Sequence, residues 1–334
     1  PYAPMREAAL ALRGQVDILI GIYHGGFEKD VDTGRLLSQT DENIAARLCE
    51  ELPFDILLTG HQHIAMAGKT YRGVHVAQTP CNGAAYIKLT VDESGAIHSE
   101  LCTPKLPARL DPWAQMLYAY LNRWLDRPIG RLSMALMPSG KLDMALHGSP
   151  IARFFNMVQL AASGADVSST ALGNEVRGFE VAVTVRDVVA SYTYSNTLVV
   201  LRVTGAVLRQ ALEQCATYFA VDAQDGVGIK ETFLRPKAAH YNYDYFDGVE
   251  YTFDLRRPEG ERVTRLTRGG VPVQAGDSLT LVTNSYRATG AGDFDFLQGC
   301  ERVREMQTEV SELILNYLRE HEMVTVPPAS TYAV

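Results

Sequence analysis

The stretch TLVVLRVTGAVLRQALEQCATYF, residues 197–219, joins a strand pattern directly to a helix pattern. Residues 197–204 are rich in β-branched side chains, which favour a pleated, buried strand. From Ala206 to Phe219 the apolar residues recur at the spacing of an amphipathic helix. A strand that leads straight into such a helix is typical of α/β domains, so this stretch sets the predicted fold class.

The same alternation extends to both sides of this stretch, over residues 131–334. On the upstream side, residues 149–163 predict a helix, with Ser149 as the N-cap and Pro150 in the first turn. The other predicted elements are strands at 165–174, 248–257, 262–270 and 278–288, a short helix and loop at 184–194, and a terminal helix at 309–321. The sequence therefore predicts one α/β domain from residue 131 to residue 334.

A second region lies at residues 1–108 and has its own pattern. Its first half predicts, in order, a helix, a strand with its loop, a helix, and a second strand with its loop. These lie at 4–13, 16–26, 40–52 and 54–63, with Thr40 and Asp41 at the start of the second helix. Residues 69–80 and 84–102 then alternate with period two, which predicts antiparallel strands that close a sheet.

Residues 109–130 are predicted to connect the two regions. A helical pattern runs from Asp111 to Asp126, and the sequence Pro-Ile-Gly at 128–130 interrupts it. We therefore divide the chain into a first region at 1–108, a connector helix or hinge at 109–130, and a second region at 131–334.

The bulk composition excludes some classes of partner. The chain has 334 residues, a net charge of −8 and no Lys/Arg-rich run, which argues against a nucleic-acid polymer. Its apolar stretches are too short for a membrane span. Five scattered cysteines without a CxxC pattern indicate free thiols more than a disulfide framework. The sequence lacks a signal peptide, but it begins with Pro1 inside a helix pattern, so we expect that Pro1 is not the natural start.

Three histidines lie on loops that follow the two predicted strands of the first region. His24 follows the first strand, and His61 and His63 follow the second. Neutral imidazole is the commonest metal ligand, and open α/β sheets bind ligands at the carboxyl ends of their strands. These residues predict a metal site, and the alternative is that they are polar loop histidines with ordinary hydrogen bonds.

The motifs around these histidines resemble two blocks of the calcineurin-like metallophosphoesterases, namely His-Gly-Gly after one strand and Gly-His-x-His after the next. The resemblance implies a site for two divalent metal ions such as Zn²⁺ or Mn²⁺, in which His24 and His61 bind one ion and His63 binds the other. It also implies that the carboxylate and asparagine ligands and the general-acid histidine would lie upstream of Pro1. The catalytic residue is therefore unknown, and we expect this chain alone to be inactive.

The second region resembles the C-terminal domain of the 5′-nucleotidase family, over residues 171–219 and 241–294. The segments YTYSNTL, YNYDYFDGVEY and NSYRATGAGDF are similar to the branch of bacterial bifunctional 2′,3′-cyclic-nucleotide 2′-phosphodiesterase/3′-nucleotidases. The resemblance implies an α/β (α+β) fold in which incomplete metallophosphoesterase layers precede a nucleotide-binding C-terminal domain.

The resemblance also implies a set of substrate-binding residues. Tyr194 and Tyr286 lie at the family's two base-stacking positions, Asn174 at a position near the base or ribose, and Asp293 near the ligand. Stacking on aromatic rings contributes about 1–3 kcal/mol per base and tolerates different bases. The alternative for the tyrosines is ordinary packing in the core.

Four more polar residues near these positions have open or structural interpretations. Arg287 is either a residue at the rim of the pocket or a solvated surface arginine, and Arg177 would meet the family's arginine position only with a shift in register. Asp244 and Asp247 could suggest acid–base chemistry, but Asp247-Gly248 is a turn signal before a strand. We therefore interpret these two carboxylates as structural residues in the wall of the pocket.

The resemblance implies that the full-length protein hydrolyses 2′,3′-cyclic nucleotides and 3′-nucleotides, with nucleotide or nucleoside as its ligand. The alternatives are a 5′-nucleotidase or UDP-sugar hydrolase, a nucleotide-binding fragment without activity, and a structural fragment with a vestigial site. The resemblance further implies export to the periplasm, the cell wall or the extracellular space. The oligomeric state is left open by the sequence.

Overall fold

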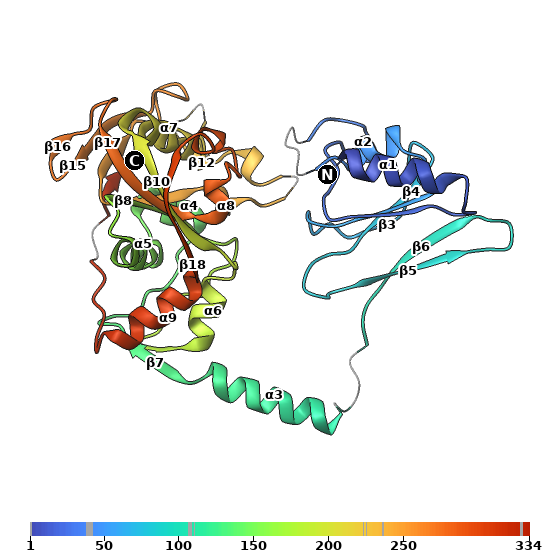
Figure 1. Cartoon of the computed structure of the whole chain (residues 1–334), viewed down its shortest axis with the longest axis horizontal. Coiled ribbons are helices and arrows are strands. Elements are labelled where there is room, and N and C mark those ends of the chain that lie inside the picture. Colours follow the sequence, from blue (N-terminus) through green and yellow to red (C-terminus); the bar gives the residue numbers. More distant parts are fainter. Residues whose placement is uncertain are drawn as a thin grey trace. The chain divides into compact units, whose positions relative to one another are not determined.

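The computed structural model describes residues 2–37, 43–105, 109, 111–222, 224, 226–235, 237–327 and 330–334. The chain separates into two compact units (Figure 1). The N-terminal unit comprises Pro1–Leu110 with Arg235–Lys237, and the C-terminal unit comprises Asp111–Leu234 with Ala238–Val334. Each unit has a hydrophobic core of its own. Within the described residues, none of the helices has the length and apolar character needed to span a lipid bilayer.

The N-terminal unit contains a four-stranded sheet in the order β1-β2-β4-β3, in which β1, β2 and β4 run parallel and β3 is antiparallel to β4. A separate hairpin is formed by β5 and β6. The elements are α1 (Tyr2–Arg13), β1 (Ile20–Tyr23), α2 (Ala45–Glu51), β2 (Ile56–Thr59), β3 (Met66–Tyr71), β4 (Val74–Gln78), β5 (Tyr86–Val91) and β6 (Ile97–Cys102). The predicted order of helix, strand, helix and strand is present.

The second helix of this unit is shorter than the sequence predicts. It begins after Ile44, which makes no side-chain capping bond. The predicted start at Thr40 and Asp41 lies outside the described residues. The buried residues of α2 include Leu48 and Cys49, which contribute to the core with Leu57 of β2.

The C-terminal unit is a mixed α/β domain. It contains the helices α3 (Pro112–Leu125), α4 (Lys141–His147), α5 (Pro150–Ser163), α6 (Val185–Ser191), α7 (Gly205–Ala216), α8 (Ser285–Ala288) and α9 (Val310–Glu320). Its strands are β7 (Pro128–Arg131), β8 (Val167–Ala171), β9 (Ala182–Thr184), β10 (Thr197–Thr204), β11 (Phe219–Val221), β12 (Val227–Ile229), β13 (Asp244–Asp247), β14 (Glu250–Phe253), β15 (Val263–Arg268), β16 (Val271–Pro272), β17 (Ser278–Asn284), β18 (Glu301–Glu309) and β19 (Tyr332–Ala333). The short 3₁₀ turns are η1 (Glu231–Phe233), η2 (His240–Asn242) and η3 (Asp295–Leu297).

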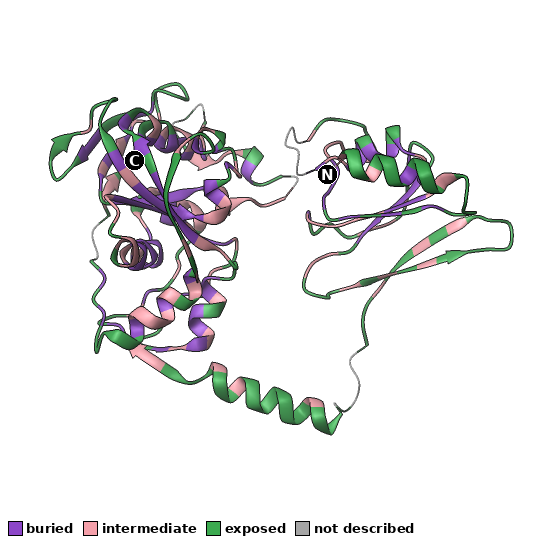
Figure 2. Ribbon diagram, viewed as in Figure 1, coloured by how far each residue is buried: buried purple, intermediate pink, exposed green. Residues whose placement is uncertain are grey.

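The central sheet of this unit has the strand order β13-β8-β17-β10-β18. The pair β8 and β17 is parallel, and the other neighbours are antiparallel. Helix α5 packs against β8 and β13, with Phe154 and Phe155 fully buried. Figure 2 shows the buried residues concentrated along α5 and the central strands. The predicted cap of α5 is confirmed, because the Ser149 side chain accepts a hydrogen bond from the backbone N–H of Ala152, and Pro150 opens the helix.

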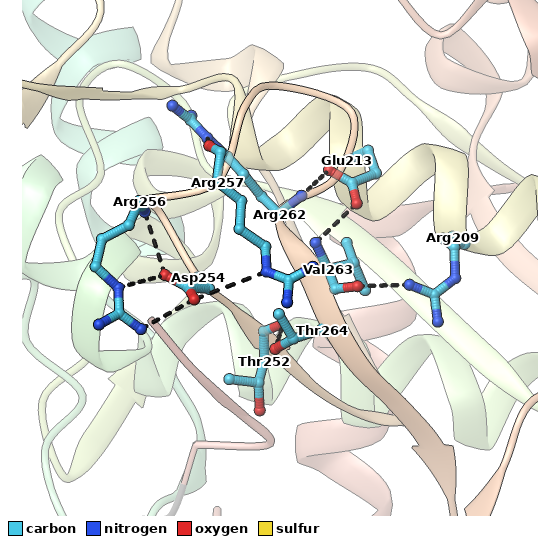
Figure 3. A network of polar contacts seen from close by, with 9 residues as sticks. All are labelled: Arg209, Glu213, Thr252, Asp254, Arg256, Arg257, Arg262, Val263 and Thr264. Carbon is cyan, nitrogen blue, oxygen red and sulfur yellow. Dashed lines mark hydrogen bonds and ion pairs between the residues drawn. The ribbon is translucent and has the colours of Figure 1, made fainter.

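A polar network joins α7 to the smaller sheet β16-β15-β14-β19 (Figure 3). The carboxylate of Glu213 accepts hydrogen bonds from the backbone N–H groups of Arg262, at 2.9 Å, and Val263, at 2.7 Å. In return, Arg209 donates to the carbonyl of Val263 at 2.6 Å. The α7 helix predicted from residues 206–219 is therefore tied to a strand about fifty positions further along the chain.

The predicted turn at Asp247-Gly248 is confirmed, because Asp244–Asp247 forms a strand of the central sheet and Gly248, with φ +88°, turns the chain into β14 of the other sheet. One predicted strand extends too far, and one strand was not predicted. The predicted strand 278–288 stops at Asn284, whose side chain caps α8. Strand β18 has no counterpart in the prediction because its sequence ERVREMQTE is highly charged. It pairs with β10 at the edge of the sheet, where charged side chains reach solvent.

Candidate functional site

The register of the central sheet brings the predicted binding residues to one of its ends. The parallel strands β8 and β17 have their carboxyl ends there, at Ala171 and Asn284. The antiparallel strands β10 and β13 begin at the same end, because Leu198 pairs with Asn284 and Asp244 pairs with Ala171. The segments that follow or precede these strand ends therefore gather at one edge, where ligands of open α/β sheets bind.

Tyr194 and Tyr241 are in the segments that precede the two antiparallel strands. Tyr194 lies between α6 and β10, and the residue is 43% exposed. Tyr241 lies in η2, directly before β13. The two ring centroids are 6.3 Å apart and the rings meet edge to face, with an angle of 64° between their planes. Partial burial raises the pKa of Tyr194, so its phenol stays protonated at neutral pH.

Tyr286 lies in α8, which follows the carboxyl end of β17. The helix is capped by Asn284, whose side chain accepts from the backbone N–H of Arg287 at 2.8 Å. The ring of Tyr286 is half-buried. The adjacent Ser285 hydroxyl accepts a hydrogen bond from the backbone N–H of Thr197 at 3.3 Å, so the Tyr286 helix is tied to the start of β10.

Asn174 follows the carboxyl end of β8, and both ends of its side-chain amide are engaged. Its Nδ2 donates to the carbonyl of Ala238 at 2.6 Å, and its Oδ1 accepts from the backbone N–H of His240 at 3.1 Å. The adjacent Gly173 carbonyl accepts from Nζ of Lys141 at 2.5 Å. In this arrangement the Asn174 amide holds the segment that leads to Tyr241.

A polar cluster of one buried and two half-buried side chains lies beside Asn174 and was not predicted from the sequence. It contains Lys141, Tyr218 and His240, and the Tyr218 hydroxyl is 2.6 Å from Nδ1 of His240. Burial lowers the pKa of Lys141. Burial, with a further contribution from Lys141, lowers the pKa of His240. The sequence offers no signal for this cluster, because its members are 22 or more positions apart.

Asp293 lies at the tip of the glycine-flanked loop after α8. It is exposed and has left-handed backbone, with φ +68°. Gly292 before it has φ +72°, and a Cβ there would lie 2.2 Å from both Nη1 of Arg287 and Oδ1 of Asn242. The loop can therefore pass this close to Arg287 only because residue 292 is glycine.

Arg287 is not at a rim or on the surface, so both interpretations from the sequence are wrong. Its side chain is 1% exposed and forms an ion pair with Asp244, also 1% exposed, at 2.7 Å. Asp247 is nearly buried as well, and its carboxylate lies 3.2 Å from Nη1 of Arg153. Arg177 is exposed and lies 3.9 Å from Asp187. Asp244 and Asp247 are therefore structural residues with arginine partners.

The three predicted metal ligands lie at strand ends of the N-terminal unit. His24 follows β1, and His61 and His63 follow β2. The ring centroids of His24 and His61 are 5.7 Å apart. His61 and His63 both have left-handed backbone, with φ +65° and +58°, a conformation that costs energy for non-glycine residues and is enriched at functional sites. Burial lowers the pKa of His63 and so favours its neutral, ligating form.

The donor set around these histidines does not by itself fit a metal pair. Across the described part of the chain, no group of three or more His, Cys, Asp or Glu side chains is arranged to hold a metal ion. A bridged pair of divalent ions needs carboxylate ligands in addition to imidazole. Within the described residues, the three histidines therefore do not form such a site by themselves.

Comparison with known proteins gives a consistent result for the C-terminal unit. Residues 129–299 match the family described as 5′-nucleotidase, C-terminal domain. A curated protein from Haemophilus influenzae, named 2′,3′-cyclic-nucleotide 2′-phosphodiesterase/3′-nucleotidase, is 34% identical over 126 residues, which is 32% of this chain and 18% of that protein. The trifunctional nucleotide phosphoesterase YfkN of Bacillus subtilis is 26% identical over 155 residues, 43% of this chain and 10% of that protein.

Among solved structures, a putative 5′-nucleotidase from Staphylococcus aureus, in complex with α-ketoglutarate, is similar over both units. It is 32% identical with a TM-score of 0.87, and the match covers 99% of this chain and 66% of that one. The chain thus spans about two thirds of the length of that protein. The matches to the curated relatives above cover a fifth of their length or less.

Proposed function

Because the chain belongs to the 5′-nucleotidase family through its C-terminal domain, we propose that it is the nucleoside-binding part of an enzyme that hydrolyses nucleotide phosphoesters. One observation carries this proposal. The sheet register gathers Tyr194, Tyr241 and Tyr286 at a single sheet end together with Asn174. Half-exposed aromatic rings at a strand end can stack on a nucleobase, and polar side chains in the neighbouring loops can form hydrogen bonds with the ribose.

The substrates we propose are 2′,3′-cyclic nucleotides and 3′-nucleotides. Support comes from the tyrosines at both stacking positions and from the names of the curated Haemophilus, Yersinia and Salmonella relatives. A 5′-nucleotidase is the second candidate, since the name of the similar Staphylococcus structure points to it. Export to the periplasm or cell wall is part of the same proposal and rests on family membership.

For the phosphate chemistry, we propose that His24, His61 and His63 hold divalent metal ions together with ligands from outside this chain. Such ions would clamp phosphate oxygens and supply an activated water. The residues of this chain contribute imidazoles on two adjacent loops, and residues 109–130 would connect this part to the nucleoside-binding domain. We therefore expect the 334-residue chain to bind nucleosides without turning over nucleotides.

The test is a calorimetric titration of this chain with adenosine. Replacement of a stacking ring costs roughly 1–3 kcal/mol, so Tyr194→Ala and Tyr286→Ala should each weaken binding about 5-fold to 150-fold. Tyr120→Ala on α3, where the ring is 61% exposed, is the matched control and should bind like wild type. Failure of wild type to bind adenosine, or full affinity in both pocket variants, would overturn the proposal.

A second assay addresses the substrate. Incubation with Mn²⁺ and either 2′,3′-cyclic AMP or 5′-AMP should give no turnover with this chain. A longer protein that adds the missing metal ligands should hydrolyse 2′,3′-cyclic AMP faster than it hydrolyses 5′-AMP. Faster hydrolysis of 5′-AMP would favour the 5′-nucleotidase candidate instead.

A further inference from the structure

The side chain of Arg287 is the most deeply buried cation of the candidate site. Its guanidinium meets the carboxylate of Asp244 in a two-pronged pair, with Nη2 2.7 Å from Oδ1 and Nε 3.2 Å from Oδ2. Arg287 lies in α8 and Asp244 begins β13, so the pair joins two segments 43 positions apart in sequence. Both side chains are 1% exposed.

The remaining donors of Arg287 contact backbone carbonyls. Nη1 donates to Ala291 at 2.7 Å and, more weakly, to Gly292 at 3.5 Å. Nη2 donates to Tyr241 at 3.0 Å. All five N–H groups of the guanidinium therefore have an acceptor. One face of its plane lies over the buried ring of Phe294, with 4.1 Å between Cζ and the ring centroid.

Each segment held by Arg287 carries a residue of the proposed pocket. Tyr286 is its neighbour in α8, Tyr241 offers it a carbonyl, and the 291–292 carbonyls precede Asp293. Because the Tyr241 ring contacts the Tyr194 ring, the same guanidinium also acts indirectly on the segment between α6 and β10. We propose that the Arg287–Asp244 pair is the positioning element of the nucleoside pocket, an inference that rests on the proposed function.

Stability alone does not account for this pair. A buried ion pair often contributes no more than well-packed apolar residues of the same volume, because both charges lose hydration. A planar fork with five fixed donors, in contrast, holds several carbonyls in one geometry, which the single ammonium of lysine cannot do. We therefore expect the pocket to depend on the planar geometry of the Arg287 guanidinium and not only on its charge.

The chain contains a more exposed ion pair that serves as a control. Arg268 contacts Asp166 with the same Nη2–Oδ1 distance of 2.7 Å. Asp166 directly precedes β8, whereas Asp244 pairs with the last residue of β8, so the two pairs lie at opposite ends of that strand. The Arg268 and Asp166 side chains are 47% and 34% exposed, and the pair lies at the end of β8 opposite the end that carries the candidate site.

The first experiment compares adenosine binding by wild type, Arg287→Lys and Arg268→Lys, below the melting temperature of each protein. We expect Arg287→Lys, which keeps the charge but loses the fork, to weaken binding about tenfold or more, and Arg268→Lys to bind like wild type. Wild-type affinity in Arg287→Lys would overturn the inference and leave the proposed function intact. If wild type itself does not bind adenosine, the proposed function fails instead. The second experiment, which uses no ligand, then still tests whether the Arg287–Asp244 pair positions the tyrosines.

The second readout needs no ligand. In the free protein labelled with ¹³C-tyrosine, Arg287→Lys should shift the ring signals of Tyr241 and also of Tyr194, whose ring contacts that of Tyr241. Arg268→Lys should leave both signals in place. If Arg287→Lys does not fold, the neutral pair Asp244→Asn/Arg287→Gln, which buries no charge, takes its place with the same expected shifts. Unchanged signals of Tyr194 and Tyr241 would overturn the inference.

Discussion

Gln62 binds the backbone of Phe27 through both ends of its side-chain amide. Oε1 accepts from the N–H of Phe27 at 2.9 Å, and Nε2 donates to its carbonyl at 2.9 Å. Gln62 is 4% exposed and stands between His61 and His63, whereas Phe27 lies three residues after His24 in the loop that follows β1. The bonds therefore close the two histidine loops onto each other.

Replacement of Gln62 by leucine should loosen both loops. The change keeps the side chain's size but leaves a buried N–H and a buried C=O of Phe27 unpaired, at roughly 1–3 kcal/mol each. We expect urea unfolding of the N-terminal unit to show a loss of about 2–6 kcal/mol. Gln15→Leu is the control, because the Gln15 side chain donates to Ala11 on an exposed surface. Equal stability of the two variants would contradict this assignment.

Substitutions at Asn174 should separate its two hydrogen bonds. Asn174→Ala loses both, whereas Asn174→Asp still accepts from the N–H of His240 but cannot donate to Ala238. We expect both variants to weaken adenosine binding and Asn174→Ala to lose roughly 1–3 kcal/mol of stability. The measurements are calorimetric titration and urea unfolding, with Asn316→Ala in α9 as the control. Wild-type affinity in Asn174→Ala would show that the segment leading to Tyr241 does not depend on this amide.

Gly292→Ala should disturb the loop that Arg287 holds. The backbone there is left-handed and the added Cβ would approach Nη1 of Arg287 and Oδ1 of Asn242 to 2.2 Å. We expect a loss of about 1–3 kcal/mol from backbone strain, with an additional contribution from the clash. Gly276→Ala, where the added Cβ has no atom within 4 Å, is the control. A thermal melt in which both variants behave like wild type would argue against the described loop conformation.

Asp247 should make the free energy of unfolding fall as the pH rises, which is the opposite of what an acid with a lowered pKa does. Burial raises the pKa of its carboxyl from 3.8 to about 6, although Arg153 opposes the rise. The folded state thus holds the proton more tightly than the unfolded state. The contribution of Asp247 is therefore fully present below pH 4 and is lost as the pH rises through 6, by roughly 3 kcal/mol.

Asp247→Asn removes this titration and retains an oxygen for Arg153. Relative to wild type, the variant should gain stability between pH 4 and pH 7, as measured by urea unfolding at both values. A difference between the two proteins that is the same at both pH values would rule out Asp247 as the titrating group.

Local patterns in the sequence determined the elements that carry the site. The β-branched run at 197–204 and the helix after it depend on neighbours two to four positions away. The strand forms over the predicted residues, and the helix forms but ends at Ala216, before the predicted end at Phe219. In the same way, an apolar run followed by Gly60 indicates a strand end with His61 and His63 on its loop. Such features are readable because the side chains that define them are close in sequence.

Only the tertiary structure decided which polar side chains hold the loops together. Arg287 and Asp244 are 43 positions apart, Asn174 and Ala238 are 64 apart, and Gln62 and Phe27 are 35 apart. From the sequence alone, Arg287 beside Tyr286 could equally be a surface residue or a residue at the rim of the pocket. Only the sheet register shows that it lies against the carboxylate of Asp244. Strand pairing and burial across the whole domain determine each of these partners. Buried polar groups are almost always hydrogen-bonded, and the fold decides which groups come close enough to bond.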